Sequence, residues 1–309
     1  MKNFIRIFFF ILNSAAVIYS QTAAAANMSK SDSLRNEGEI LQAIAECRKV
    51  YLQNPGNQPN IYNYARFLSI NKQIDSCFKY LNIAVDIDTS ISPLIEPDFL
   101  SARESEQWND FENRLISNLN IKFRNAVKDI DYAKLLWKLR AFDQAYFLET
   151  EIAGRKLGFK SSVVEALWKL KFMIQEKSQK ELVEWIDKKG WPRIINVGRE
   201  AAFTAWLVIM HSNSKLQKKY LPVIKKICEE NELPWARYAS IYDRSQFNDN
   251  KPQKYGTHIS YNEKTGSMEL YKLENESMVN VWRKEVGLQP LEEYLKQNNI
   301  PYTPGTINR

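Results

Sequence analysis

Residues 201–210 have the sequence AAFTAWLVIM, which is apolar on almost every face of a helix. A helix of this kind is buried on all sides. His211 follows at once, and the polar residues after it end the helix: Ser212, Asn213 and Ser214. We therefore expect the His211 imidazole where a rigid core helix meets a polar edge. Two roles are open for it, a cation that caps the helix dipole or a member of a functional site.

Helical periodicity dominates the sequence on both sides of this segment. Apolar residues recur at steps of three and four. One run contains Phe123, Val127, Ile130, Leu135, Leu136, Leu139, Phe142 and Tyr146, and another contains Val164, Leu167, Trp168, Leu170, Lys171 and Ile174. A further helix with Leu182, Trp185 and Ile186 should end at Gly190, because glycine stops helices and Pro192 follows two residues later. Another helix should begin near Trp235 and close at Asp243-Arg244.

The C-terminal part contains a different pattern. Apolar residues alternate with polar ones on either side of a loop that contains Gly266. This alternation predicts a short β-hairpin near residues 255–273, followed by a helix at about 277–285. The predicted fold class is therefore mainly α, with a helical domain at 117–300 that carries one hairpin, and a tail at 301–309.

Residues 27–116 contain a helical repeat. Small or apolar residues recur with a period of 34, the length of a tetratricopeptide repeat. The expected packing positions are Ala43, Cys47, Val50, Ile61, Tyr64, Ala65, Leu68, Cys77, Leu81 and Ala84. The pattern resembles divergent tetratricopeptide repeats and covers about one and a half of them. Such a region either binds a peptide or protein on a concave surface or caps the next domain, and its shortness favours the cap.

The first 26 residues resemble an export signal. Lys2 and Arg6 precede an apolar run that is too short to span a bilayer, and alanines follow at 23–26. We expect cleavage after Ser20 or one of these alanines, with an uncleaved anchor as the alternative. The mature protein should be exported, periplasmic or secreted, and without a membrane span.

The composition and net charge of the chain limit the kinds of partner that it can bind. The chain of 309 residues is 44% hydrophobic and 26% charged, which excludes a low-complexity disordered protein. Removal of Lys2 and Arg6 with the signal lowers the formal net charge from +7 to +5. The densest basic cluster consists of Lys215, Lys218, Lys219, Lys225 and Lys226. Because export is expected, we predict no nucleic-acid partner.

Cysteine usage points away from a metal or cofactor. Cys47, Cys77 and Cys228 cannot all pair within one chain, and no two have the spacing of metal ligands. Buried free thiols are favoured over a Cys47–Cys77 disulfide, because both positions are apolar helix positions. We predict no cofactor and no metal.

The order of polar motifs carries a family resemblance. The chain contains, in this order, Asp143-Gln144, Gly190-Trp191-Pro192, His211, Asp243-Arg244, Gln253 and Tyr255-Gly256-Thr257. This order resembles a bacterial family of unknown function, numbered 6624, over about residues 143–294. The sequence departs from the family pattern where Met210 and His258 replace glutamines and Phe147 replaces an arginine. If the replaced residues carry family chemistry, this copy is altered or inactive.

We predict one polar pocket in the C-terminal domain. Its candidate residues are His211, Asp243, Arg244, Gln253, Tyr255, Thr257 and His258, with Asp143 and Gln144 as secondary candidates. These groups would hydrogen-bond a small polar ligand or a peptide end in a binding or scaffolding module. The alternative is a hydrolase or group-transfer enzyme in which His211 and Asp243 form a general base and Arg244 stabilises negative charge. A metal bound by the two histidines and Asp243 is disfavoured, because His258 departs from the pattern.

Overall fold

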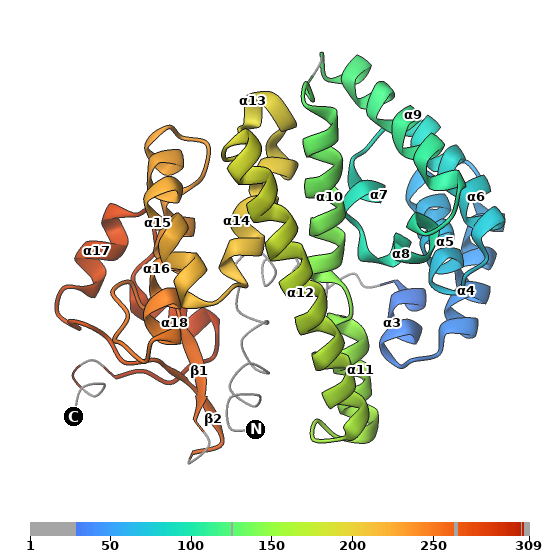
Figure 1. Ribbon diagram of the computed structural model, residues 1–309. Helices are drawn as coiled ribbons and strands as arrows, with labels where there is room; N and C mark the ends of the chain where they lie inside the picture. Colours follow the sequence, from blue (N-terminus) through green and yellow to red (C-terminus); the bar gives the residue numbers. More distant parts are fainter. Residues whose placement is uncertain (1–28, 125, 263–264, 304, 306–309) are drawn as a thin grey trace. The chain divides into compact units, whose positions relative to one another are not determined.

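The computed structural model describes residues 29–124, 126–262, 265–303 and 305, so the predicted export signal at 1–26 lies outside them. The described chain is mainly helical and contains one two-stranded antiparallel sheet, which confirms the predicted fold class (Figure 1). Among the helices of the described residues, none combines the length and the apolarity needed to cross a bilayer. The chain forms two compact units, Met28–Val208 and Ile209–Arg309. The predicted boundary at 116–117 therefore lies inside the first unit.

The first unit begins with consecutive helices that contact their neighbours in the chain. They are α3 (Lys30–Asn36), α4 (Ile40–Gln53), α5 (Gln58–Ile70) and α6 (Ile74–Ile87). Nine of the ten expected packing positions in this region are buried, the exception being the half-buried Val50. The burial agrees with the predicted periodicity, whereas the assignment to tetratricopeptide repeats stays a prediction.

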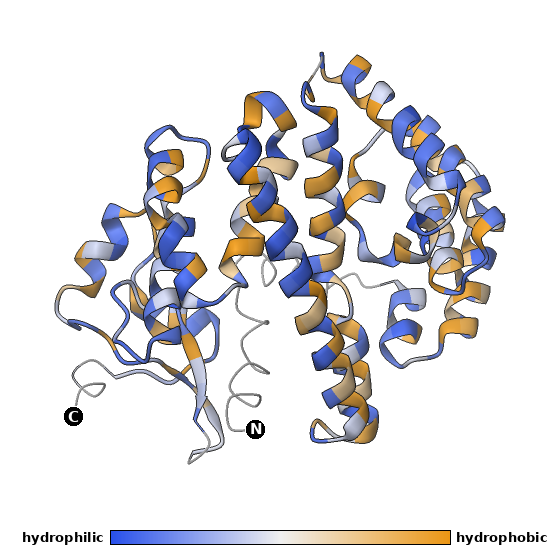
Figure 2. Ribbon diagram, in the orientation of Figure 1, coloured by the Kyte–Doolittle hydropathy of each residue, from blue (hydrophilic) through white to orange (hydrophobic). Residues whose placement is uncertain are grey.

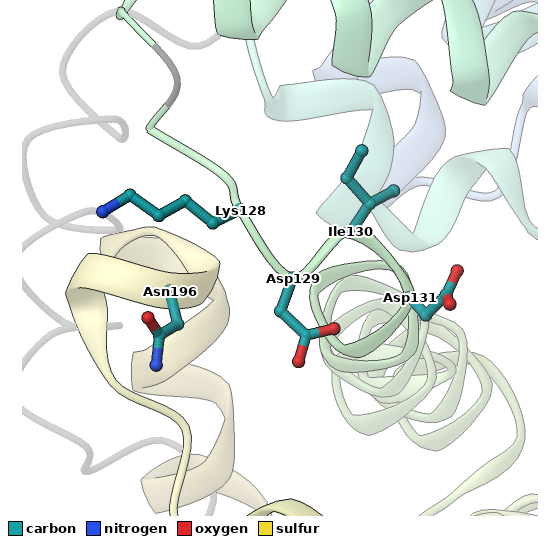
Figure 3. A pocket seen from close by; sticks show the side chains of 5 residues that line it. All are labelled: Lys128, Asp129, Ile130, Asp131 and Asn196. Carbon is teal, nitrogen blue, oxygen red and sulfur yellow. The ribbon is translucent and has the colours of Figure 1, made fainter.

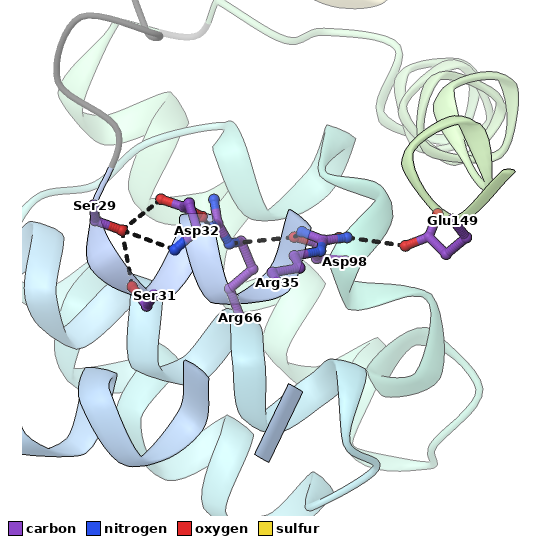
Figure 4. Close-up of polar contacts among 7 residues, drawn as sticks. All are labelled: Ser29, Ser31, Asp32, Arg35, Arg66, Asp98 and Glu149. Carbon is purple, nitrogen blue, oxygen red and sulfur yellow. Dashed lines mark hydrogen bonds and ion pairs between the residues drawn. The ribbon is translucent and has the colours of Figure 1, made fainter. Parts of the chain in front are cut away.

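Short elements and a buried ionic network follow. The elements are α7 (Ser92–Ile95), η2 (Pro97–Phe99), α8 (Leu100–Arg103) and α9 (Gln107–Lys122). Asp98 of η2 pairs with both Arg35 of α3 and Arg66 of α5, and Arg66 also pairs with Asp32 (Figure 4). Arg35 also donates to Glu149, 3.0 Å away. A buried charge must be paired, so this network joins α3 and α5 to later elements.

The remaining helices of this unit are α10 (Ile130–Gln144), α11 (Phe147–Leu157), α12 (Ser162–Lys189) and α13 (Ile194–Val197). The helical periodicity predicted from Phe123 onward is wrong for its first turns. Phe123 is 52% exposed, and the side chain of Asn120 bonds the backbone N–H and C=O of Val127. The helix starts only at α10, where the Asp129 side chain accepts from the Tyr132 N–H. The predicted stop at Gly190 is confirmed, since Gly190 has φ +79° and caps α12.

Helix α14 (Arg199–Met210) is the predicted core helix, and it ends one residue before His211. The boundary between the two units falls within it. The second unit also contains α15 (Ser214–Glu229), α16 (Trp235–Asn248), β1 (Ile259–Asn262), β2 (Ser267–Leu270), α17 (Val279–Glu285) and α18 (Leu291–Gln297). Strands β1 and β2 pair with Ile259 opposite Leu270, which confirms the predicted hairpin.

The three cysteines are free and buried. Burial raises the pKa of Cys77 to about 12 and that of Cys228 to about 11. Thiols of this kind are poor nucleophiles, because only the thiolate attacks.

Candidate functional site

Asp243 is the centre of the predicted site residues. It lies on α16, is 0% exposed, and accepts four donors from one loop. Its oxygens accept from the backbone N–H groups of Lys254 (2.8 Å), Tyr255 (3.0 Å) and Thr257 (3.0 Å), and from Thr257 Oγ1 (2.9 Å). Burial raises the pKa of Asp243 to about 6, and the donors of the loop oppose this rise. The carboxylate therefore serves as the anchor of residues 254–257.

Gln253 holds the two ends of the same loop together. Its Nε2 donates to the carbonyl oxygens of His258 and Tyr271, both at 2.9 Å, and its Oε1 accepts from the His258 N–H at 2.8 Å. Gln253 is 0% exposed. Both polar atoms of this side chain are therefore used, in closing the loop at His258 and in joining it to Tyr271, just after β2.

Arg283 of α17 completes the loop from the other side, and the sequence analysis missed it. Its Nη1 donates to the carbonyl oxygen of Tyr255 at 2.7 Å, and its Nε donates to that of Gln289 at 2.7 Å. Tyr294 Oη donates to the Thr257 carbonyl oxygen at 3.3 Å. The sequence does contain a signal for Arg283. The residues four before it and three after it, Val279 and Val286, are apolar and lie on the same face of the helix.

Gly256 is the turning point of the loop. It has φ +64°, a conformation that favours glycine. A Cβ atom there would lie 2.8 Å from Leu291 Cδ1. Both the backbone conformation and the close approach of α18 therefore require a glycine.

His258 and Arg244 lie beside this network. The His258 ring is buried, with its centroid 3.8 Å from that of Phe247. Burial and, to a smaller extent, Arg244 hold the pKa of His258 well below its usual range. His258 is therefore neutral at pH 7, which makes it a poor proton donor. The guanidinium carbon of Arg244 lies 5.8 Å from the Phe247 ring centroid.

His211 does not join the network around Asp243. It is half-buried, and the four donors to Asp243 all come from residues 254–257. The end of α14 is held by Gln217, whose Nε2 donates to the carbonyl oxygens of Met210 (2.9 Å) and Ser212 (3.0 Å). Those four donors use both oxygens of the Asp243 carboxylate, so Asp243 is committed to the loop and is not available to orient His211 as a general base.

Asp143 and Gln144 belong to the other compact unit. Gln144 Nε2 donates to Asp143 Oδ2 at 2.6 Å. The ammonium of Lys171, which is 1% exposed, donates to the carbonyl oxygens of Asp143 (2.7 Å) and Ala145 (2.9 Å). It also lies 3.1 Å from the ring centroid of Phe147. Burial lowers the pKa of Lys171 to about 7.

A row of half-buried aromatic rings lies next to the loop, where the ring centroid of Tyr242 is 5.9 Å from that of Tyr255. Half-buried rings follow one another on α16 and α17: Trp235, Tyr238, Tyr242 and Trp282. Neighbouring centroids on α16 are 5.8 and 6.3 Å apart. The ammonium of Lys254 lies 4.9 Å from the Trp282 ring and 5.3 Å from that of Tyr255. We call these four rings together with Lys254 the aromatic face.

A hollow of about 740 Å³ lies in the first unit, at the start of α10 (Figure 3). Its lining residues are Lys128, Asp129, Ile130, Asp131 and Asn196. The backbone N–H groups of Lys128 and Asp129 donate to the Asn196 carbonyl oxygen, at 2.8 and 2.9 Å. Lys189 binds both carboxylate oxygens of Asp129 at 2.8 Å. The hollow therefore has a carboxylate that is already neutralised, and it contains none of the predicted site residues.

Comparison with known proteins identifies the family but no activity. The model of the "Family of unknown function (DUF6624)" matches residues 142–303, just over half of the chain. No curated protein and no solved structure matches the chain. The matched range contains Asp143, the loop that Asp243 anchors, and all of the aromatic face. The chain therefore belongs to the family of unknown function DUF6624.

Proposed function

We propose that the protein is an exported, non-catalytic binding protein, and that its C-terminal unit binds its ligand on the aromatic face. The observation that carries this proposal is the environment of Asp243. A general base must come within hydrogen-bonding reach of a substrate proton. Asp243 has no exposed surface, and both of its oxygens already accept bonds from the loop. The motif residues around it are engaged in holding a loop, which favours a scaffold over a catalyst.

The loop supports the face in a specific way. Asp243, Gln253 and Arg283 fix the backbone of residues 253–258 from three sides. Lys254 and Tyr255 are therefore presented in one orientation, next to Trp282. Sites whose supporting backbone is rigid lose less conformational entropy when a ligand binds.

The chemistry of the face suggests the ligand. Tryptophan and tyrosine supply large contact areas and are enriched in binding hot spots. Lys254 adds a cation that two rings hold in place. The complementary partner is a polypeptide segment that offers aromatic or apolar side chains together with a carboxylate. The proposed location outside the cytoplasm rests on the export signal that the sequence predicts at residues 1–26. Mass determination of the native protein tests it, since an intact Met1 would contradict export.

Selection of binding peptides tests the proposed function. Random dodecapeptides displayed on phage are panned on the full mature chain. We expect enriched peptides to combine aromatic and acidic residues. Binding should fall at least tenfold in Trp282→Ala and in Lys254→Glu, because each change removes one half of the recognition.

Two controls make the test specific. Ile195→Ala changes an exposed apolar side chain in the first unit and should leave peptide binding unchanged. Circular dichroism checks that the variants remain folded. The proposal is wrong if binding peptides are indifferent to Trp282→Ala and Lys254→Glu, or if the protein turns over a substrate in a manner that requires His211.

A further inference from the structure

Helix α12 has an apolar face that the other helices of its own unit leave partly exposed. Half-buried or exposed apolar residues occupy one stripe of its N-terminal half: Val163, Ala166, Leu167, Leu170, Met173 and Ile174. Met173 is 68% exposed and Leu170 39%. Figure 2 shows hydrophobic residues recurring along α12 among polar ones. We call these six residues the α12 stripe.

The stripe is separate from the face by which α12 packs in its own unit. Helices α10 and α11 contact α12, and its buried residues include Val164, Trp168 and Lys171. At 100° per residue these lie on one side of the helix, and the stripe lies beside them. The spacing of three and four residues within the stripe is that of a helix-to-helix seam. The stripe therefore has the pattern of a second packing surface.

We propose that the α12 stripe binds the same stripe of a second copy of this chain, with the two helices antiparallel. The twofold axis passes near Ala166 and Leu167, where a small side chain permits close approach. This arrangement places Val163 against Leu170 of the partner subunit. A self-complementary patch is what a twofold interface requires.

Charged residues at the border of the α12 stripe decide whether the two helices run parallel or antiparallel. Glu165 and Lys169 are exposed and lie on one flank, where they form an ion pair at 2.9 Å. Antiparallel helices bring equivalent flanks together, so Glu165 meets the partner subunit's Lys169 and the reverse pair forms as well. Parallel helices would instead place Lys169 against the other, largely apolar flank. The charge pattern therefore favours the antiparallel pair.

The area of the α12 stripe limits the affinity of the dimer. With the twofold axis near Ala166 and Leu167, the two helices overlap from about residue 162 to residue 171. Ten residues of helix span about 15 Å, and with a helix about 10 Å wide the footprint is about 150 Å². A standard stable interface buries about 800 Å² of each partner. The dimer should therefore be weak and concentration-dependent.

Sedimentation velocity on the full mature chain over a wide concentration range tests the proposal. We expect the wild type to shift from monomer to dimer as concentration rises. Leu170→Glu should weaken the dimer at least tenfold, because it places a carboxylate in the seam. Leu41→Glu is the matched control, since Leu41 is 72% exposed on α4 and lies outside the stripe.

Charge reversal tests the direction of the helices. Glu165→Lys and Lys169→Glu should each weaken the dimer, and the double variant should restore it. Circular dichroism of every variant confirms that α12 is still folded. The proposal is overturned if the wild type remains monomeric at its highest soluble concentration, if Leu170→Glu dimerises like the wild type, or if the double variant does not recover. Hydroxyl-radical footprinting that finds Met173 protected in a monomer would show that another part of this chain covers the stripe, and it would also overturn the proposal.

Discussion

At the residue scale, Asp243 is the side chain on which the C-terminal unit depends most directly. Replacement by asparagine keeps the shape but turns one acceptor oxygen into an NH₂ group. Either the Lys254 N–H or the two donors of Thr257 then lose their partner. A buried donor left unsatisfied costs about 1–3 kcal/mol. We expect Asp243→Asn to lower the free energy of unfolding by about 2–4 kcal/mol, measured by urea denaturation.

Asp249→Asn is the matched control for this change. Asp249 follows the end of the same helix, and its partly exposed carboxylate pairs with Lys218. Exposed ion pairs contribute about 0–1 kcal/mol. An equal loss of stability in the two variants would contradict the anchoring role of Asp243.

Lys171 gives the chain a specific pH dependence. Burial lowers its pKa in the folded protein to about 7, whereas the unfolded chain has the ordinary value near 10.5. Between these values the unfolded chain binds more protons, so stability rises with pH and is lost as pH falls through 7. In Lys171→Met this contribution should disappear, so that stability rises less steeply with pH than in the wild type. The measurement is the free energy of unfolding at several pH values between 7 and 10, in wild type and variant.

The control for Lys171 lies on the same helix. Lys169→Met removes an ammonium whose side chain is 61% exposed. The free energy of unfolding of Lys169→Met should change with pH between 7 and 10 in the same way as that of the wild type. If that of Lys171→Met also changes in this way, the ammonium is hydrated in the folded protein and the prediction is wrong.

At the scale of elements, the turn between α11 and α12 depends on a glycine within a helix. Gly154 lies in α11, where alanine would normally be better by about 1 kcal/mol. Here a Cβ would lie 2.2 Å from Phe159 Cε1. We therefore expect Gly154→Ala to lower the melting temperature, which calorimetry measures. In a Phe159→Ala background the same change should be neutral or stabilising, and an unchanged penalty there would exclude the ring as the cause.

At the scale of the whole molecule, the N-terminal helices depend on the rest of the first unit. Arg35 pairs with Glu149, and Arg155 donates to the Asn36 carbonyl oxygen at 2.9 Å. Helix α10 also contacts α7 and η2. A fragment of residues 27–116 loses all of these partners. We expect it to show no cooperative thermal transition by circular dichroism, while a fragment of residues 27–208 should melt cooperatively.

A cooperative melt of the short fragment would mean that the repeat-like region is an independent domain. In that case the proposal of a peptide-binding surface on these helices would gain support, because a domain that folds alone does not need to act as a cap.

Local sequence patterns predicted the helices and strands correctly where no side-chain contact from elsewhere in the chain overrode the local preference. The stop at Gly190, the core helix before His211 and the hairpin around Gly266 each follow from backbone preference or hydrophobic period. The run from Phe123 failed, because its apolar spacing continues through a segment whose backbone is bonded by Asn120 instead. Period alone does not distinguish a helix from a loop whose apolar residues happen to keep the same spacing.

The sequence by itself determined the helical class, the place of the hairpin and the identity of the motif residues, since these depend on neighbours within a few positions. The family match covers residues 142–303, the range that contains Asp243, Gln253 and Thr257. Only the tertiary structure decided what these residues do. Whether a carboxylate is a base or an anchor depends on which donors surround it, and those donors lie on a loop eleven to fourteen residues away. Arg283, which holds that loop from the other side, is 28 residues from Tyr255, a separation that no local period connects.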